Sequence, residues 1–414
     1  MPTQYFSFGH YLATIGTSNF GLGLFTLIYP WLIVGVLQES PSRLGMAQMA
    51  LLLPNLLFIL PGGVVSDRSH RGSWLSLLYL LYLVPVGVLA GAILTNQLSF
   101  LVLIVCGMAF GTVSAFVQPT RESLLGYAAP NLMHQAVAKV VMVQFIAQGI
   151  GFAAAGQLES IGVTFLLALQ MAAFVASSLL IRQSHPRPLE RDKETLKPRQ
   201  PLTELREGVQ LFFETKALFH LVVLTFATGA LAFGVYLVGM PLIAKQAYGG
   251  GAQLYAAMQV TFTLGVVSAN FGVMKRAKMF NRPGRLIIIT FLWRGGLVGV
   301  VGLLPSFWVL FPTLFVWGFF SGLSMTLGRT LLHNQVPHEL RSRASSVYQL
   351  CLFGGAPLGA WGCGFSIEAI GLSYTFMGIT CLTLIVSVAA FFSPLWALVG
   401  RQHDRQGLVG GKSN

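Results

Sequence analysis

Twelve long apolar stretches run through this sequence, and they constrain its fold more than any other feature. A helix needs about 20 apolar residues to cross the hydrocarbon core of a membrane. Of the 414 residues, 54% are hydrophobic and 9% are charged, whereas soluble domains carry roughly 25% charged residues. We therefore predict an all-α membrane protein with twelve transmembrane helices. The predicted spans are residues 10–37, 44–66, 73–94, 99–126, 131–158, 161–182, 217–245, 251–276, 285–304, 306–332, 341–367 and 371–399.

The basic residues between these spans predict the orientation of the chain, whose net charge is +13. Lysines and arginines gather in the even-numbered loops, such as Arg68 and Arg71 after span two and the run 275–285 after span eight. The opposite side offers only Arg43 and Lys245. Because basic loops stay in the cytoplasm, we expect both termini to be cytoplasmic in the inner (plasma) membrane. These residues lack interleaved aromatic side chains, so no nucleic-acid partner is expected.

A polar segment, residues 183–216, divides the chain into two parts and contains four prolines and dense mixed charge. We interpret it as a cytoplasmic linker between an N-terminal six-helix bundle, 1–182, and a C-terminal one, 217–400. A cytoplasmic tail follows at 401–414. Apolar residues recur at helical spacing over 201–213, which predicts a short amphipathic helix on the inner membrane surface. A solvated tether is the alternative.

The two parts resemble each other at the ends of spans four and ten. Arg121 precedes Pro130, and Arg329 precedes Pro337, at offsets of 208 residues for the arginines and 207 for the prolines. Repeated six-helix halves around a site near the membrane midplane are a common transporter architecture. We therefore predict two pseudo-symmetric bundles.

The loop after span two combines glycines, a carboxylate and arginines. Glycines at a helix end let a neighbouring backbone approach, a carboxylate can face the positive N-terminus of another helix, and arginines meet anionic headgroups. The loop resembles the loop 2–3 signature of the major facilitator superfamily, although two positions differ. The resemblance implies that Asp67 faces the start of span eleven and holds an inner gate shut; a solvated aspartate is the alternative. The predicted gate residues are Gly62, Gly63, Asp67, Arg68 and Arg71.

Three further stretches resemble the enterobactin-exporter and macrolide-efflux branch of that superfamily: Pro119-Thr120-Arg121, Leu205-Arg206-Glu207-Gly208-Val209, and residues 240–251. The resemblance covers essentially the whole chain. It implies a secondary transporter that works by alternating access and exports an amphipathic small molecule such as a siderophore or hydrophobic drug. The open alternatives are a lipid or lysolipid flippase, an organic-anion importer, and a transport-dead membrane sensor or assembly subunit.

The resembled fold implies a cavity lined mainly by spans one, four, seven and ten. Aromatic side chains there supply contact area and amides supply adaptable hydrogen bonds, which suits a bulky, lipophilic and partly polar ligand. Ordinary helix packing is the alternative for each residue. The predicted lining residues are Asn19, Tyr29, Ser114, Gln118, Arg121, Glu122, Gln144, Gln148, Phe233, Tyr236, Trp317, Ser321, Ser324, Arg329 and Gln349.

Ionisable groups within spans are costly and usually face a cavity or one another. We expect Arg121 and Arg329 at the cytoplasmic mouth of the cavity, where they would favour an anionic substrate; extension to the headgroups is the alternative. Glu122 is expected to pair with an arginine of the loop after span two. Arg294, within span nine, is expected to reach the headgroups or to bridge helices.

Several features of other protein classes are missing from the sequence. No Asp or Glu lies near the middle of a predicted span, and residues 106–111 lack the arginine that many antiporters of the resembled superfamily carry there. We therefore do not expect classical proton antiport. There is no phosphate-binding loop or His/Cys/Asp cluster, so no enzyme activity, cofactor or metal is expected. The four cysteines lie in apolar stretches, which predicts no disulfide. The expected partners are the substrate and membrane lipids, and the expected state is a monomer.

Overall fold

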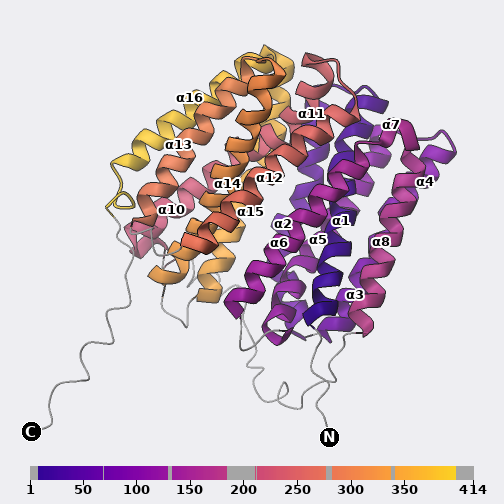
Figure 1. The fold of residues 1–414 in the computed structure, drawn as a ribbon, viewed down its shortest axis with the longest axis horizontal. Coiled ribbons are helices and arrows are strands. Elements are labelled where there is room, and N and C mark those ends of the chain that lie inside the picture. The colour runs from indigo at the N-terminus through magenta and orange to yellow at the C-terminus, as the bar shows by residue number, and fades with distance from the viewer. Residues whose placement is uncertain are drawn as a thin grey trace, which may run out of the picture.

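The computed structural model describes residues 8–68, 70–128, 133–183, 210, 212–276, 282–336 and 341–397, which form helices and connecting loops without a strand (Figure 1). The first group of helices is α1 (Phe8–Trp31), the π-helical turn η1 (Leu32–Val36), α2 (Pro41–Arg68), α3 (Arg71–Leu81), α4 (Leu83–Leu94), α5 (Phe100–Ala128), α6 (Met133–Ala155), α7 (Leu158–Ile161) and α8 (Val163–Gln183). The second group is α10 (Lys216–Ala227), η3 (Thr228–Ala232), η4 (Val235–Gly239), α11 (Met240–Leu242), η5 (Ile243–Ala247), α12 (Ala252–Arg276), α13 (Pro283–Gly302), α14 (Phe307–Gln335), α15 (Arg341–Ile370) and α16 (Leu372–Phe391).

Helices occupy all twelve predicted spans, because a membrane offers the backbone no other partners for its hydrogen bonds. Span one is α1 with η1, span three is α3 with α4, and span seven runs from α10 to η5. In the described chain, ten helices are long and apolar enough to cross a membrane, and α6 contains a shorter apolar segment, Lys139–Ala155. With α2 in the place of span two, the predicted all-α, twelve-helix architecture is confirmed.

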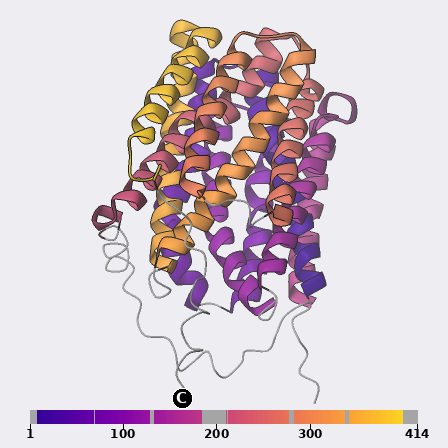
Figure 2. The ribbon, with the colours of Figure 1, turned by 60° about the vertical axis from the view of Figure 1, so that its left-hand side comes forward.

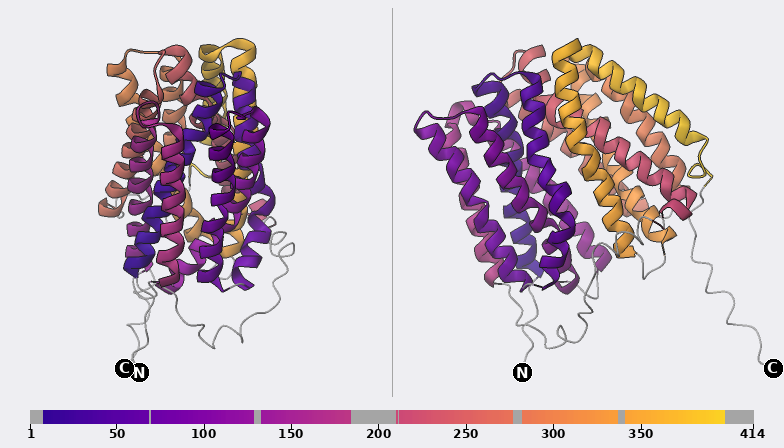
Figure 3. Two further views of the ribbon diagram at one scale, coloured as in Figure 1. Left: turned by 90° about the vertical axis from the view of Figure 1, so that its right-hand side faces the viewer. Right: turned by 180° about the vertical axis from the view of Figure 1, so that it is seen from behind.

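The two groups of helices touch at one end of the molecule and diverge toward the other (Figure 3). We call the diverging end the linker end, because α8 ends there at Gln183 and α10 begins there at Lys216 (Figure 1). The opposite end, where α2 begins at Pro41 and α15 ends at Ile370, is the far end. Turning the molecule shows the helices of both groups running between these two ends (Figure 2).

The internal repeat is much clearer in the backbone than in the sequence. The described residues with positive φ form three pairs, at offsets of 211, 208 and 209 residues: Gln38 with Gly249, Asn96 with Leu304, and Gly162 with Gly371. Each pair occupies the same inter-helix connection of the two halves. Packing repeats as well, because α2 lies mainly against α5 while its equivalent α12 lies mainly against α14.

Spans one and seven both end in a π-helical turn at the far end. In η1 the Leu37 N–H donates to the Leu32 carbonyl at 2.9 Å, and in η5 the Tyr248 N–H donates to the Ile243 carbonyl at 3.1 Å. Span seven contains two further π-helical turns, η3 and η4. Such turns are frequent at functional sites, and here they mark the two helices that the fold places beside the substrate pathway.

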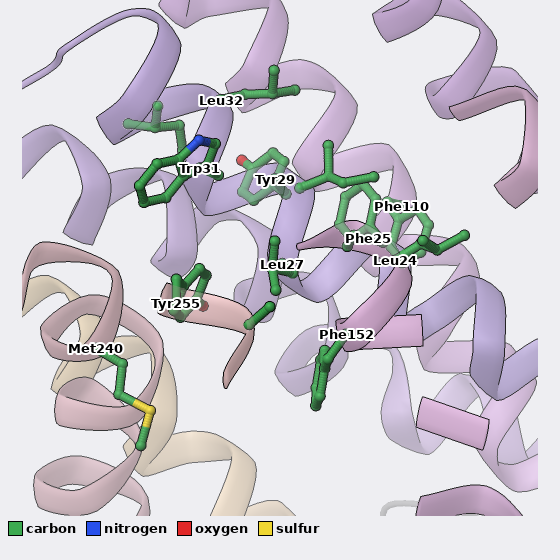
Figure 4. Close-up of a cluster of buried hydrophobic side chains, with 14 of the residues drawn as sticks. Leu24, Phe25, Leu27, Tyr29, Trp31, Leu32, Phe110, Phe152, Met240 and Tyr255 are labelled. Atoms are coloured by element: carbon green, nitrogen blue, oxygen red, sulfur yellow. The ribbon is translucent and has the colours of Figure 1, made fainter. Parts of the chain in front are cut away.

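Aromatic side chains fill the interior of the N-terminal half. Phe25 stacks on Phe110 with ring centroids 3.6 Å apart and on Tyr29 at 5.1 Å (Figure 4). The Tyr29 hydroxyl donates to the carbonyls of Ala47 at 3.3 Å and Leu103 at 3.1 Å. Tyr29 therefore ties span one to spans two and four.

Two predicted segments fall largely outside the described residues. They are the amphipathic helix at 201–213, of which Gln210 and Phe212–Phe213 are described, and the tail at 401–414. Phe212 is buried against the C-terminal half. The four cysteines are free, as predicted.

Candidate functional site

The closest contact between the two halves lies at the far end, where α2 crosses α15. A Cβ atom on Gly45 would sit 2.8 Å from the Ala360 carbonyl oxygen and 3.1 Å from the Gly364 Cα. A Cβ atom on Gly364 would sit 2.9 Å from the Gly45 Cα. Small residues allow such backbone contact between membrane helices, so these two glycines let the far end close completely.

Two carboxylates fasten the same end. Glu368, near the end of α15, accepts the Ser42 N–H at the start of α2 at 2.9 Å. Glu159, in α7, accepts the Ala252 N–H at the start of α12 at 3.0 Å. A negative charge is favourable at a helix N-terminus, which carries a partial positive charge and unpaired N–H groups. We call these two contacts the far-end latches.

The far-end latches are equivalent by the internal repeat. The carboxylates are 209 residues apart and the N–H groups that they accept are 210 residues apart. In each latch a residue at the end of an odd-numbered span, five or eleven, binds the start of an even-numbered span in the other half. One pseudo-symmetric device therefore holds both sides of the interface.

Aromatic and cationic side chains add to the closure. Trp31 of α1 stacks against Tyr255 of α12 with ring centroids 6.3 Å apart, and the Lys245 ammonium lies 5.8 Å from the Trp31 ring. Figure 4 shows Trp31 and Tyr255 on helices of the two different halves. Toward mid-depth the halves are still adjacent, because a Cβ on Gly354 would lie 3.5 Å from Leu56.

The predicted gate lies at the linker end, where the ribbons of the two halves diverge (Figure 3). The backbone of α2 continues to Arg68, α3 begins at Arg71, and α15 begins at Arg341. The side chains of Gly62, Gly63, Asp67, Arg68 and Arg71 lie outside the described residues. The role of Asp67 in closing this end thus stays a prediction.

Three predicted lining residues are inaccessible in this conformation, which corrects their assignment to an open cavity. Asn19 is buried and donates its amide to the Ile15 carbonyl at 2.7 Å. Tyr29 is enclosed by its own half, and Trp317 packs edge-on against Phe262 with centroids 5.3 Å apart. Their helices are apolar on several faces, so the sequence could not indicate which face turns inward.

The other predicted lining residues, Arg121 excepted, retain accessible surface. Tyr236 packs on Phe262, and their ring centroids are 4.9 Å apart. Phe262 thereby links span seven to Trp317 of span ten, a connection that the sequence analysis missed. The partly or fully accessible residues of the predicted set are Ser114, Gln118, Glu122, Gln144, Gln148, Phe233, Tyr236, Ser321, Ser324, Arg329 and Gln349.

The two arginines at equivalent positions have different surroundings. Arg329 is exposed on α14, whereas Arg121 on α5 is only 6% exposed and lies within electrostatic range of Tyr11 and Tyr79. The Tyr11 hydroxyl donates to the Arg121 carbonyl at 2.9 Å. Burial excludes extension of Arg121 to the headgroups. Glu122 is exposed and accepts the Gln118 amide at 2.8 Å.

Arg294 is buried inside the C-terminal half, so extension to the headgroups is wrong for this residue as well. Its Nη2 donates to the Thr228 hydroxyl at 3.0 Å, and its guanidinium lies 5.4 Å from the Phe291 ring. Because Thr228 belongs to η3, Arg294 bridges span nine to the π-helical part of span seven. This is the helix-bridging role that the sequence left open.

The profile of one protein family, the Major Facilitator Superfamily, matches residues 11–360. The chain belongs to the Major Facilitator Superfamily. No curated protein sequence matches the chain significantly. Membership in this superfamily agrees with the twelve helices, the internal repeat and the fastening of one half to the other at a single end.

Solved transporters of this architecture resemble the structure at low sequence identity. An auto-inhibited POT family peptide transporter matches with a TM-score of 0.72 and 14% identity, covering 98% of each chain. The xylose transporter XylE from E. coli, in an inward-open conformation, gives 0.71 and 12% identity over 95% of this chain and 97% of its own. The nucleoside transporter NupG gives 0.68 and 12% over 92% and 97%. Such low identities establish the transporter fold alone.

Proposed function

We propose that this chain is a secondary transporter that exports an amphipathic organic molecule, a siderophore or hydrophobic drug, across the inner (plasma) membrane. The observation that carries the alternating-access part is the far-end closure by Gly45, Gly364 and the far-end latches. Meanwhile Gln144 and Gln148 on α6 keep accessible surface. Closure at one end with accessible polar groups deeper in the pathway is what alternating access requires.

The orientation follows from the distribution of basic residues. In this proposal the linker end is cytoplasmic, because the loops there are the basic ones, and both termini are cytoplasmic with it. The conformation then faces inward, as the structure of XylE does. An exporter loads its substrate from this state.

The proposed substrate class follows from the accessible residues. Tyr236, backed by Phe262, offers an aromatic surface, and the two glutamines on α6 offer adaptable hydrogen bonds. Arg329 is an exposed cation on α14. Together they favour a lipophilic molecule with an anionic or zwitterionic group, bound by a monomeric transporter. The resemblance to the enterobactin-exporter and macrolide-efflux branch supports the direction of transport.

A thermal-shift screen of the purified protein against siderophores, macrolides and lysolipids tests the binding step, because a ligand of the folded state raises apparent stability. Tyr236→Ala should lose the shift. Tyr374→Ala is the matched control, since Tyr374 on α16 is 71% exposed.

The flux of a positive compound in proteoliposomes then tests transport and its direction. Export of a siderophore or drug supports the proposal. Binding without flux would instead indicate a sensor, flux of lysolipids alone a flippase, and inward accumulation of anions an importer.

A further inference from the structure

Arg294 is a buried cation without a counterion in the described part of the C-terminal half. The residue is 4% exposed, and its one hydrogen bond in the described structure goes to the Thr228 hydroxyl. Its Nε–H has no acceptor, although a guanidinium carries five N–H donors. Among the described residues, no carboxylate forms an ion pair with it. A buried charge of this kind is costly inside a membrane protein unless something neutralises it.

A small crevice touches this guanidinium and a second unpaired donor. Trp317 of α14 lines the same crevice as Arg294, is 1% exposed, and has no acceptor for its indole N–H. The remaining walls come from apolar side chains of spans seven, nine, ten and twelve and from Thr383. The Thr383 hydroxyl is already bonded to the Ile379 carbonyl at 2.7 Å. Arg294 and Trp317 are therefore the two donors on this crevice that await an acceptor.

Size and charge identify the occupant. The crevice has space for one water-sized body, so the carboxylate of a bulky organic substrate is too large. Water would accept both N–H groups but would leave the positive charge unneutralised. A halide ion accepts hydrogen bonds from both donors and neutralises the guanidinium in a low-dielectric interior.

We propose that Arg294 and Trp317 bind one small monovalent inorganic anion, such as chloride, within the C-terminal half. The site adjoins η3 through Leu231 and Ala232. Thr228, the hydrogen-bond partner of Arg294, is the first residue of that π-helical turn. The anion thus neutralises the cation that ties span nine to span seven. This site is separate from the residues proposed to bind the exported molecule, apart from Trp317.

The test compares the melting temperature of the purified protein in chloride and in gluconate at equal ionic strength, because an anion that binds the folded state raises apparent stability. Wild type should melt higher in chloride, and Arg294→Gln should show no difference between the two salts. Trp317→Phe keeps an aromatic ring but removes the N–H. It should raise the half-maximal chloride concentration about tenfold, the size expected for one hydrogen bond. Arg329→Gln, which removes an exposed charge from the same half, should respond like wild type.

Bromide provides a direct readout if Arg294→Gln does not fold. Crystals grown in bromide should show an anomalous peak between Arg294 and Trp317. Equal melting of wild type in chloride and gluconate would overturn the proposal, as would absence of the peak. A chloride response that survives in Arg294→Gln, or that disappears equally in Arg329→Gln, would also overturn it.

Discussion

Replacing Gly45 by alanine should shift the protein away from the far-end-closed conformation. The added Cβ would lie 2.8 Å from the Ala360 carbonyl oxygen and 3.1 Å from the Gly364 Cα. Ordinary van der Waals contact begins at 3.4 Å, so α2 and α15 must separate by about 0.6 Å, the difference between 3.4 and 2.8 Å. Both opposing atoms belong to the backbone and cannot rotate away.

The size of the shift follows from the cost of overpacking, which is typically about 1–3 kcal/mol. This clash exists only while the far end is closed. The ratio of far-end-open to far-end-closed molecules should therefore rise about 5- to 150-fold. Alanine also favours a helix over glycine by roughly 1 kcal/mol, but that gain applies to both conformations and cancels from their ratio.

Spin labels at Gln97 and Ser306, which are exposed connecting residues of the two halves, can measure this ratio after the four native cysteines are replaced. Double electron–electron resonance should show a longer distance component in Gly45→Ala and in Gly364→Ala. Gly362→Ala is the matched control, because a Cβ at that position of α15 meets no atom within 4 Å. An unchanged distribution in both test variants, or an equal change in Gly362→Ala, would refute the reasoning.

Three further perturbations test the ends of the helices. Glu159→Gln keeps the shape of its latch but removes the charge that faces α12, so it should raise the reactivity of a cysteine at the far end; adding Glu368→Gln should raise it further, and no rise in the double variant would contradict the latch. Asp67→Asn should lose transport at normal expression, since a carboxylate at a helix N-terminus contributes about 0.3–1 kcal/mol, and ~2 kcal/mol when partly buried, and 1.4 kcal/mol is a tenfold change in population. Wild-type flux in that variant would exclude the gate. Reporter fusions should place Thr195 in the cytoplasm and Asn96 outside, and an external signal at Thr195 would invert the topology.

The fold could be predicted because its causes are local and repetitive. Apolar stretches of sufficient length must be helices in a membrane, and basic loops set their orientation. The repeat was visible in sequence only at Arg121 and Arg329. In the structure it extends to every pair of positive-φ connections, such as Gln38 with Gly249. Backbone conformation at a loop is compatible with many side chains, so little of this similarity remains in the sequence.

The site was less predictable, because its contacts are tertiary. Glu159 and Glu368 resemble ordinary acids at span ends, and each binds a backbone N–H, a partner that has no sequence signature. Their offset of 209 residues, close to that of the arginines, was the one available signal. Arg294 was expected to bridge helices or reach the membrane surface, and only the position of Thr228 decides between these roles. An apolar helix does not reveal which of its faces is internal.

The antiparallel pair of α2 and α15 carries a carboxylate near the C-terminal end of each helix. Glu368 of α15 binds the start of α2 at the far end, and Asp67 of α2 is expected to bind the start of α15 at the linker end. If the two halves rock as rigid bodies, the helices cannot be close at both ends, so the two contacts exclude each other. Each carboxylate then stabilises the opposite conformation, and removing one should favour the state held by the other.

This reciprocity makes a prediction that neither contact makes alone. Asp67→Asn should increase the far-end-closed population, Glu368→Gln should decrease it, and the double variant should return toward the wild-type distribution. The same pair of spin labels at Gln97 and Ser306 measures all three. If the two substitutions shift the distribution in the same direction, the carboxylates do not stabilise opposite conformations, and α2 and α15 do not work as a two-ended switch.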